Sequence, residues 1–241
     1  MDDFVEPGAV RHGNFINYYD FNSAPERRDL LPLDDDLWRT TTEASQQPYL
    51  VLDVGCNAGN FTQLLYEFLV QKKPNRKIIM LGVDIDPVLI ERATQANQFK
   101  ENVFYSCYNV MEYDDAENCI ANHLKAQGKY QFDVVCCFSI TMWIHLNNGD
   151  DGLLRFLDLM VQLSEILVIE PQPWSCYKNA VRRMKRAGAQ DTFPLFGALK
   201  MRNDVEQSIK DYLKCKKLLA IIYESDATKW KRKICFYRKG A

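Results

Sequence analysis

Two aspartates and two glycines have the types and the spacing of a site for a nucleoside cofactor. Asp53-Val54-Gly55-Cys56-Asn57-Ala58-Gly59 follows one apolar run, and Asp84 follows the next apolar run. Glycines allow a backbone to approach a ligand closely, and a helix that begins after them supplies free N–H groups. An acidic residue after the second strand can accept hydrogen bonds from both ribose hydroxyls. The two motifs together predict a site for a ligand that contains adenosine.

The position of Asp53 separates two cofactors of this kind. A dinucleotide fingerprint has the form G-x-G-x-x-G and wraps a pyrophosphate. Here the pattern is Asp53-x-Gly55-x-x-x-Gly59, with a carboxylate before the first glycine. That carboxylate would repel a pyrophosphate but can attract the amino group of a methionine. The loop therefore favours S-adenosylmethionine over NAD.

The elements that must position these residues follow from hydrophobic patterning. Apolar runs predict strands over 49–54, 77–83, 103–108, 132–138, 166–170, 218–224 and 234–238. Helical patterns cover about 61–70, 87–98, 115–127, 151–164, 175–187 and 204–214. Alternation of the two indicates an α/β, Rossmann-like fold, with a mostly parallel seven-stranded sheet and helices on both faces. The short connection before the last strand predicts an antiparallel pair at the end of the chain.

The chain has 241 residues, of which 47% are apolar, so one core can be built from it. We expect a single structural domain, in which residues 1–47 are a peripheral N-terminal segment that covers the active site and residues 48–241 carry the sheet. In ligand-binding sheets of this class, the site lies beyond the carboxyl ends of the strands.

Composition excludes several classes of protein. The formal net charge is -2, so no global positive field marks a general nucleic-acid binder. No stretch approaches the roughly 20 apolar residues of a membrane span, and the acidic start is unlike a signal peptide. We therefore expect no membrane association and a location in the cytoplasm, with the nucleus as the alternative. Eight cysteines without a CxxC pair and only three histidines predict reduced thiols and no metal site.

Four motifs together resemble one family of methyltransferases. The Asp53–Gly59 loop is similar to motif I of class I methyltransferases. Residues 139–150 (SITMWIHLNNGD), 170–177 (EPQPWSCY) and 13–19 (GNFINYY) resemble signatures of the Bicoid-interacting-protein-3 family. The similarity runs from about residue 13 to residue 238. It implies the class I S-adenosylmethionine-dependent fold, with 48–241 as the methyltransferase domain.

The family has two familiar branches. One is a long enzyme that caps the γ-phosphate of a small nuclear RNA, and the other is a short RNA 5′-monophosphate methyltransferase that acts on microRNA precursors and histidine transfer RNA. The short length and the runs 84–89 and 136–146 resemble the second branch more. Asn22 stands where the capping branch has an arginine, which fits a monophosphate better than a triphosphate.

The resemblance and the motifs together give a cofactor site. Its expected members are Arg27, Asp53, Gly55, Asn57, Asp84, Ile85, Asn109, Val110 and Phe138. Arg27 can fork onto the methionine carboxylate, and Ile85 can pack against the base. Asn109, where relatives often carry Asp, would meet the adenine amino group through its side-chain carbonyl.

The substrate end must hold a phosphate in line with the methyl group. A phosphate monoester has a second pKa near 6, so it is mostly dianionic at neutral pH and needs positioning more than a strong base. We expect Tyr18, His145 and Lys178 to position the phosphate. We expect Tyr19, Tyr177, Arg182 and Arg183 to bind the RNA. The alternatives are an aromatic lid for the two N-terminal tyrosines, a satisfied core histidine for His145, and a solvated face for the basic helix.

These residues predict an O-methyltransferase that acts on 5′-phosphorylated RNA, as a monomer. Three alternatives stay open: capping of a γ-phosphate, methylation of a protein or small molecule, and an inactive RNA-binding scaffold that still holds the cofactor. Methylation of 5′-phosphorylated but not 5′-hydroxyl RNA would separate the first reading from the others.

Overall fold

One seven-stranded sheet organises the molecule in a computed structural model that describes residues 10–15, 18–41, 47–113, 118–188, 193–217 and 219–239. The strand order is β3-β2-β1-β4-β5-β7-β6. The strands are β1 (Tyr49–Val54), β2 (Ile78–Asp84), β3 (Val103–Cys107), β4 (Phe132–Phe138), β5 (Ser164–Glu170), β6 (Leu219–Glu224) and β7 (Cys235–Lys239). All pairs are parallel except β5 with β7 and β6 with β7. The predicted fold class and the antiparallel pair are confirmed.

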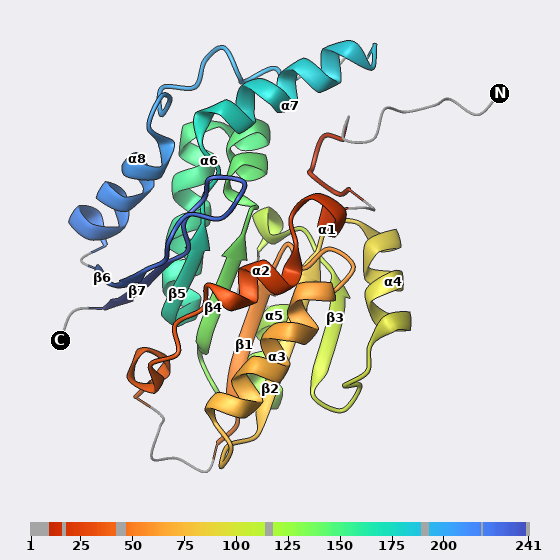
Figure 1. The fold of residues 1–241 in the computed structure, drawn as a ribbon, viewed down its shortest axis with the longest axis vertical. Helices are drawn as coiled ribbons and strands as arrows, with labels where there is room; N and C mark the ends of the chain where they lie inside the picture. The colour runs from red at the N-terminus through yellow and green to blue at the C-terminus, as the bar shows by residue number, and fades with distance from the viewer. Residues whose placement is uncertain are drawn as a thin grey trace.

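Helices cover both faces of the sheet (Figure 1). The α-helices are α1 (Tyr18–Phe21), α2 (Ala24–Asp29), α3 (Asn60–Lys72), α4 (Pro87–Ala96), α5 (Cys119–Ala126), α6 (Thr141–Leu163), α7 (Trp174–Arg186) and α8 (Val205–Asp211). The shorter elements are the 3₁₀ turns η1 (Asp35–Trp38) and η2 (Val110–Glu112) and the π-helical turn η3 (Tyr212–Lys216). Pro87 opens α4 as expected, behind an Asp86 side chain that accepts hydrogen bonds from the Val88 and Leu89 amides.

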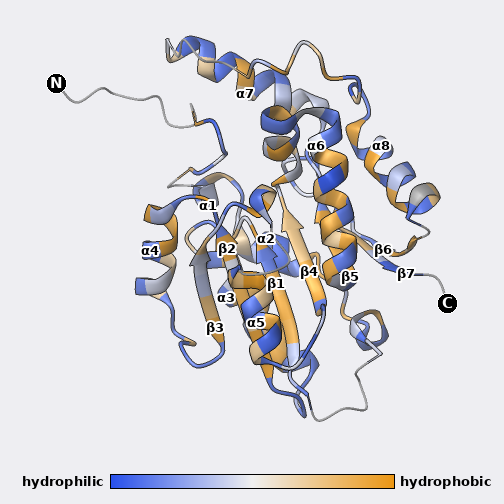
Figure 2. Ribbon diagram, turned by 180° about the vertical axis from the view of Figure 1, so that it is seen from behind, coloured by the Kyte–Doolittle hydropathy of each residue, from blue (hydrophilic) through white to orange (hydrophobic). Residues whose placement is uncertain are grey.

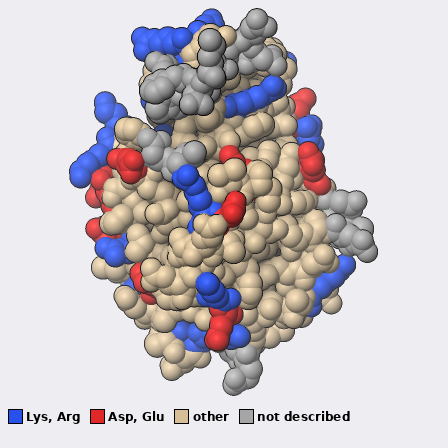
Figure 3. Space-filling model, turned by 90° about the vertical axis from the view of Figure 1, so that its right-hand side faces the viewer, with Lys and Arg blue, Asp and Glu red and all other residues tan. Residues whose placement is uncertain are grey.

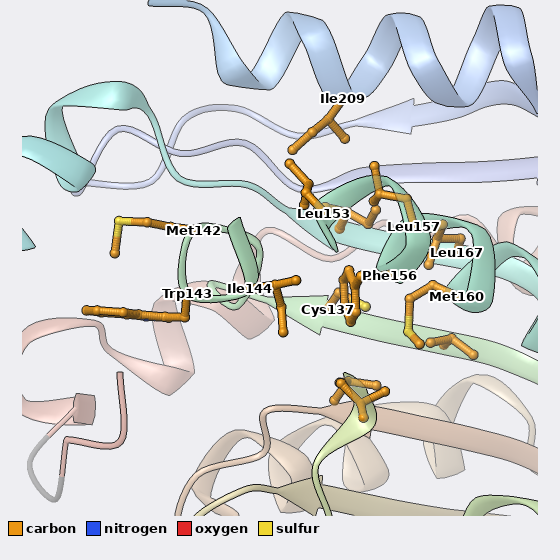
Figure 4. Packing of buried hydrophobic residues seen from close by; sticks show 14 of the residues in the cluster. Cys137, Met142, Trp143, Ile144, Leu153, Phe156, Leu157, Met160, Leu167 and Ile209 are labelled. Carbon is orange, nitrogen blue, oxygen red and sulfur yellow. The ribbon is translucent and has the colours of Figure 1, made fainter. Parts of the chain in front are cut away.

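The central strands are apolar on both faces because both faces are covered. Every residue of β1 and β4 is buried, and both strands are orange along most of their length in Figure 2. Leu50 and Leu52 belong to one core, which includes Phe156 and Leu157 of α6. Tyr49 and Val51 point to the other core, which includes residues of α3. Figure 4 shows the first core, in which Phe156, Leu157 and Met160 pack together while Met142 and Trp143 lie apart, at the start of α6.

The N-terminal segment contributes to the core. Trp38 is fully buried, and its ring centroid lies 5.0 Å from that of Phe236 and 5.5 Å from that of Phe68. Its indole N–H donates to the carbonyl oxygen of Pro32 at 3.0 Å. Residues 10–15 and 18–41 are therefore tied to the sheet domain by apolar packing, rather than only lying on its surface as the sequence suggested.

Helix α6 begins ten residues earlier than predicted, at Thr141 instead of residue 151. The sequence Asn147-Asn148-Gly149-Asp150 reads as a loop, and Gly149 does break the helical geometry with φ 73° and ψ −175°. The chain resumes the helix on the far side of this kink. As a result, the motif after β4 is a helical turn and not an extended strand end.

The strand order reverses between β1 and β4, so a crevice is expected above their carboxyl ends. In Figure 1 these ends point upward, toward α1 and α7. Within the described residues, no helix is both long and apolar enough to cross a membrane. The eight cysteines all lie in described ranges and all are free thiols. In the same ranges, no group of His, Cys, Asp and Glu is arranged to hold a metal ion.

Candidate active site

The loop between β1 and α3 depends on its glycines. Gly55 and Gly59 have φ of 78° and 75°, in the left-handed region that favours glycine. A Cβ atom on Gly55 would lie 2.9 Å from Cδ1 of Ile140. The amides of Gly55 and Cys56 donate to the Val83 carbonyl oxygen at 2.8 and 3.1 Å. The loop is thus pinned to the end of β2, with its backbone facing the crevice.

Asp84, the last residue of β2, joins this loop to the next helix. Its Oδ2 atom accepts from the Asn57 amide at 2.9 Å, and its Oδ1 atom accepts from the Asp86 amide at 3.0 Å. Burial raises the pKa of Asp84, against the lowering effect of these amides. The side chain lines two adjoining pockets at the strand ends. It lies where the sequence predicts a ribose-binding carboxylate.

The first of these pockets, here called the slot, is narrow, with a volume of about 40 Å³. Asp53, Asn57, Phe138 and Tyr19 are among the residues that line it. Asp53 is buried, and its Oδ2 atom accepts from the Thr62 hydroxyl at 2.7 Å. Burial is the main cause that raises the pKa of Asp53 to about 6. This carboxylate is a candidate partner for a ligand cation such as the amino group of methionine.

Tyr19 lies on the cofactor side of the site. Its hydroxyl donates to the Cys56 carbonyl oxygen at 3.4 Å, within the glycine loop. Burial raises the pKa of Tyr19 well above its usual value, so its proton stays in place. Tyr19 lines the slot and not the acceptor pocket described below, so its role in binding RNA stays a prediction.

The second pocket, here called the adenine pocket, has a volume of about 360 Å³. Ile85 and Val110 line it, as expected for residues that enclose a base, and so does Asn109. The Asn109 side chain is already engaged, because its Oδ1 atom caps η2 by accepting from the Met111 amide at 3.1 Å. Its Nδ2 atom donates to Glu112 Oε1 at 2.8 Å. The predicted free carbonyl for the adenine amino group is thus committed to the η2 cap.

Arg27 lines the slot, and its guanidinium group forms hydrogen bonds with three protein side chains. Its Nε atom donates to Glu170 Oε2 at 2.8 Å, and its Nη2 atom donates to the Tyr18 hydroxyl at 2.9 Å and to Ser139 Oγ at 3.2 Å. Burial alone would lower the pKa of Arg27, but the Glu170 charge together with Tyr18 and Tyr19 outweighs it and raises that pKa. The Nε–Nη2 edge of the guanidinium faces protein groups, so the contact with a methionine carboxylate, which stays a prediction, would have to use Nη1.

A third pocket, here called the acceptor pocket, lies on the other side of Tyr18 and Ser139 and has a volume of about 390 Å³. Its lining consists of Phe15, Tyr18, Phe21, Asn22, Ser139, Met142, Trp143, Gln172, Cys176, Asn179, Ala180, Arg183, Trp230 and Arg232. This set contains two arginines and no Asp or Glu among the described residues. The slot, by contrast, contains Asp53 and Asp84. The carboxylates of the site thus lie on the cofactor side, together with Arg27 and Arg11, and the acceptor pocket has only positive charges among its described lining residues.

Ser139 stands at the boundary between the two sides. It follows β4 directly, and its φ of 56° is unusual for a residue other than glycine. Its hydroxyl contacts Glu170 Oε2 at 3.2 Å, and it also accepts from Arg27 and Arg232. Ser139, Tyr18 and Trp143 line both the slot and the acceptor pocket. A group bound on one side is thus separated from the other side only by these side chains.

His145 and Tyr177 do not reach any of these pockets, so their predicted roles are wrong. Both are fully buried. The Nδ1 atom of His145 lies 3.1 Å from the Tyr177 hydroxyl, and its Nε2 atom lies 2.9 Å from Asp150 Oδ1. Both ring nitrogens are satisfied within the core. Met142 and Trp143 of the same helix face the acceptor pocket, and His145 projects from another side of that helix.

Lys178 and Arg182 are also outside the acceptor pocket. Both are exposed on α7, whereas Cys176, Asn179 and Arg183 line the pocket from the same helix. Cys176, Ala180 and Arg183 are four and three residues apart and share one face of α7, whereas Lys178 lies on the opposite side. Arg182 does not line the pocket, although it is three residues from Asn179. Of the four predicted substrate-binding residues, Arg183 alone lies in the acceptor pocket, together with Tyr18, which was predicted to position the phosphate.

Comparisons with known proteins agree with this arrangement. A family model described as Bicoid-interacting protein 3 matches residues 132–239, and one described as a methyltransferase domain matches residues 52–163. The chain is 38% identical to the pre-miRNA 5′-monophosphate methyltransferase of Xenopus laevis, over 97% of this chain and 94% of that protein. It is 35% identical to the RNA 5′-monophosphate methyltransferase of Homo sapiens, over 97% and 82%. This chain belongs to the Bicoid-interacting protein 3 family.

Two further proteins are similar to this chain at lower sequence identity. The U6 snRNA methylphosphate capping enzyme Amus of Drosophila melanogaster is 29% identical, over 80% of this chain and 62% of that protein. The N-methyltransferase NodS of Bradyrhizobium japonicum, solved with S-adenosyl-L-homocysteine, superimposes with a TM-score of 0.54 at 15% identity, over 98% of this chain and 95% of that one. The fold of this Bicoid-interacting protein 3 family member is thus the class I methyltransferase fold.

S-adenosylmethionine is the methyl donor of this enzyme, and the residues of the slot and the adenine pocket fit it. Gly55 lines both the slot and the adenine pocket. Asp84 presents acceptor oxygens for ribose hydroxyls, and Ile85 and Val110 offer apolar contacts to a base. Asp53 can accept from a charged amino group. The donor set is therefore suited to a ligand that carries an adenosine and a cation.

Sequence reasoning assigned no individual role to the residues that join the cofactor and acceptor sides. Glu170 and Ser139 appeared only as parts of motifs, and Trp230 drew no attention. Trp230 and Arg232 come from the connection between β6 and β7, far along the chain from Arg27. The antiparallel return of β7 beside β5 brings that connection to the end of β5, where Glu170 lies. A charged residue at the last position of a buried strand was the one available signal.

Proposed function

We propose that this protein transfers a methyl group from S-adenosylmethionine to the 5′-monophosphate of RNA. The observation that carries the proposal is the acceptor pocket, which has two arginines and no acidic residue among its described lining. It adjoins the slot through Tyr18 and Ser139. A basic pocket next to a methyl donor is suited to an anionic acceptor, and a terminal phosphate has the charge for it.

The relatives support the same substrate. The Xenopus laevis and Danio rerio proteins are named pre-miRNA 5′-monophosphate methyltransferases, and they are 38% and 34% identical over nearly the whole chain. MicroRNA precursors are therefore the first RNA class to test. Asn22 lines the acceptor pocket where the capping branch has an arginine, which leaves less charge for a triphosphate.

The chemistry needs a nucleophile and an aligned electrophile. S-adenosylmethionine supplies a methyl group on a positively charged sulfur. A phosphate oxygen lone pair forms the new O–CH₃ bond as the S–CH₃ bond breaks, and that electron pair stays on sulfur. The products are a methyl phosphate ester on the RNA and S-adenosylhomocysteine. No proton moves in this step when the phosphate is already dianionic.

The lining of the acceptor pocket agrees with a reaction that proceeds without a general base. Its described members include no His, Asp or Glu. Tyr18 accepts a hydrogen bond from Arg27, which leaves its own proton free to be donated to a phosphate oxygen. Arg183 and Arg232 can neutralise the dianion. The residues thus bind and orient the phosphate, which is sufficient when the substrate supplies its own nucleophile.

The RNA chain beyond its first nucleotide can follow α7. This helix carries Lys178, Arg182, Lys185 and Arg186 as exposed residues, and none of them forms an ion pair within the described residues. Figure 3 shows Lys and Arg side chains at the top of the molecule, at the height of α7 in Figure 1. Contacts of this kind supply sequence-independent affinity that decreases with salt.

A comparison of three acceptors tests the proposal. The purified protein is incubated with labelled S-adenosylmethionine and one hairpin RNA that bears a 5′-monophosphate, a 5′-triphosphate or a 5′-hydroxyl. We expect label on the first RNA. Treatment of that RNA with phosphatase beforehand, which removes the 5′-monophosphate, should abolish the reaction. Equal or greater labelling of the triphosphate would favour γ-phosphate capping instead. Labelling of the hydroxyl form would reject phosphate as the acceptor.

Three narrower statements are also proposals. We propose histidine transfer RNA as a second substrate, because the branch that the chain resembles acts on it. A cytoplasmic location is also proposed, and imaging of a tagged protein tests it. A monomeric state is proposed as well, and light scattering of the purified protein tests it.

A further inference from the structure

Arg232 is a buried cation with few partners. Its side chain is 11% exposed and lines the acceptor pocket from the connection between β6 and β7. Its Nη1 atom donates to Ser139 Oγ at 2.5 Å, and its Nη2 atom lies 3.7 Å from Cys176 Sγ. Its Nε atom is buried and has no hydrogen-bond partner. A hydroxyl, a thiol and an unused N–H are weak compensation for a charge that has been removed from water.

Glu170 does not supply the missing compensation. Two arginines converge on this carboxylate, but Arg27 donates to Oε2 at 2.8 Å, while Arg232 Nη1 remains 3.9 Å from Oε1. Oε1 instead accepts from the indole N–H of Trp230 at 2.6 Å. One carboxylate thus faces two guanidinium groups, so the three side chains Arg27, Arg232 and Glu170 together carry one positive charge in excess. Arg27 is neutralised, and the excess charge lies on Arg232.

The position of Arg232 indicates that its charge can bind an anionic ligand close to the methyl donor. Its Nη1 atom contacts Ser139, which also lines the slot. An anion bound by Arg232 in the acceptor pocket therefore lies at the boundary with the methyl donor. A guanidinium group donates two parallel hydrogen bonds to phosphate oxygens, which fixes both their distance and their orientation.

We propose that Arg232 binds the terminal phosphate of the acceptor and determines the preference for a phosphorylated 5′ end. This inference rests on the proposed function and names the residue that carries its specificity. Trp230 supports the arrangement, because it occupies Glu170 Oε1 and so prevents that atom from forming a close ion pair with Arg232. The guanidinium group stays available to substrate.

Replacement of Arg232 tests the proposal in the full-length protein. Arg232→Gln removes the charge, and its kcat/KM for 5′-monophosphate RNA should fall by roughly 10- to 100-fold, as expected for loss of charge-assisted hydrogen bonds. Its affinities for S-adenosylmethionine, measured by calorimetry, and for 5′-hydroxyl RNA, measured by fluorescence anisotropy, should stay within about 2-fold of wild type. Equal losses for phosphorylated and hydroxyl RNA, or unchanged kcat/KM, would overturn the proposal.

Two further variants serve as controls. Arg232→Lys keeps the charge but loses the fork, so we expect kcat/KM for the phosphorylated RNA between those of wild type and Arg232→Gln; wild-type kcat/KM would reject the role of the fork. This variant also answers the question if Arg232→Gln does not fold. Lys233→Gln removes the same charge at the next residue, where the side chain is half exposed and contacts Glu224 at 2.6 Å. It should change the affinities for both RNAs by one small, equal factor.

The wild-type protein separates this proposal from the proposed function. If wild type does not methylate 5′-monophosphate RNA, the proposed function is wrong. If wild type does so and Arg232→Gln is equally active, the function holds and the role assigned to Arg232 is wrong.

Discussion

The amide nitrogen of Asn57 lies 2.9 Å from Oδ2 of Asp84, so the carboxylate that is predicted to bind the ribose also holds the glycine loop in place. Asn57 has a φ of 52°, and its Nδ2 atom donates to the Phe15 carbonyl oxygen at 2.9 Å. The end of β2, the loop after β1 and the N-terminal segment are thereby linked through two adjacent bonds. Loss of the carboxylate would affect the shape of the slot as well as the ribose contacts.

Asp84→Ala should abolish detectable binding of S-adenosylmethionine. It removes the ribose acceptor and the acceptor for the Asn57 amide, and the binding cost should be about 2–4 kcal/mol. Asp84→Asn keeps an acceptor oxygen and should bind with intermediate affinity. Calorimetry measures both variants, and circular dichroism confirms that they are folded. A folded Asp84→Ala protein with wild-type affinity would show that the cofactor binds elsewhere.

Cofactor binding should weaken in acid because of Asp53. Burial is the main cause that raises the pKa of Asp53 to about 6. Only the ionised form attracts an amino group, so affinity should be constant above that pH and should fall as pH decreases through about 6. Calorimetry between pH 5 and 8 measures this change. Asp53→Asn should bind more weakly at neutral pH and should lose the pH dependence; a variant that retains it would assign the titration to another group.

His145 should matter for stability and little for the reaction. It is buried, and both ring nitrogens have partners. His145→Ala should lower the free energy of unfolding by about 2–4 kcal/mol, from a cavity and two lost hydrogen bonds. At a temperature where the variant is folded, kcat/KM should remain within about 3-fold of wild type, because no reacting group is touched. A stably folded His145→Ala variant with a large loss of kcat would show that His145 takes part in the reaction.

The same residue should make the fold sensitive to acid. Burial lowers the pKa of His145, against an opposing effect of Asp150. The unfolded chain binds a proton near the ordinary pKa of about 6.5, while the native state resists it. Its contribution to stability is therefore complete above that pH and is lost as pH falls below it. Urea unfolding at several pH values should show a smaller acid slope in His145→Asn than in wild type.

Arg183 and Arg182 form a matched pair on α7. Both are exposed, but Arg183 lines the acceptor pocket and Arg182 does not. Arg182→Gln should reduce the salt dependence of RNA affinity by about one counterion, with equal effects on phosphorylated and hydroxyl RNA. Arg183→Gln should also lower kcat/KM for the phosphorylated RNA specifically. Identical behaviour of the two variants would mean that α7 contacts the RNA chain alone.

The cofactor half of the site was largely predictable. Asp53 and Asp84 end buried parallel strands, and such strands leave a strong apolar signal whose carboxyl ends must meet at one edge of the sheet. The glycine spacing then located the loop between them. This information is local in sequence, which explains why the mostly parallel sheet and the strand ends that carry these residues could be anticipated without any structure.

The acceptor half was less predictable because long-range packing determines it. His145 and Trp143 are two residues apart on one helical turn, and their sequence does not say which of them faces the pocket. The Arg27–Glu170 ion pair joins the second helix to the end of the fifth strand, and neither residue carries a local sign of its partner. Arg232 lies among lysines and resembles one more solvated charge, although the return of β7 buries it beside Ser139.

The absence of acids from the described lining of the acceptor pocket also bears on how the enzyme releases its product. A phosphate monoester enters with close to two negative charges, and its methyl ester leaves with one. In the proposed role, the two arginines would attract the product less strongly than the substrate, and the added methyl group would occupy space that their hydrogen bonds to the phosphate otherwise use. Methylation thus lowers the affinity of the pocket for the 5′ end, so that unmethylated 5′ ends displace methylated ones.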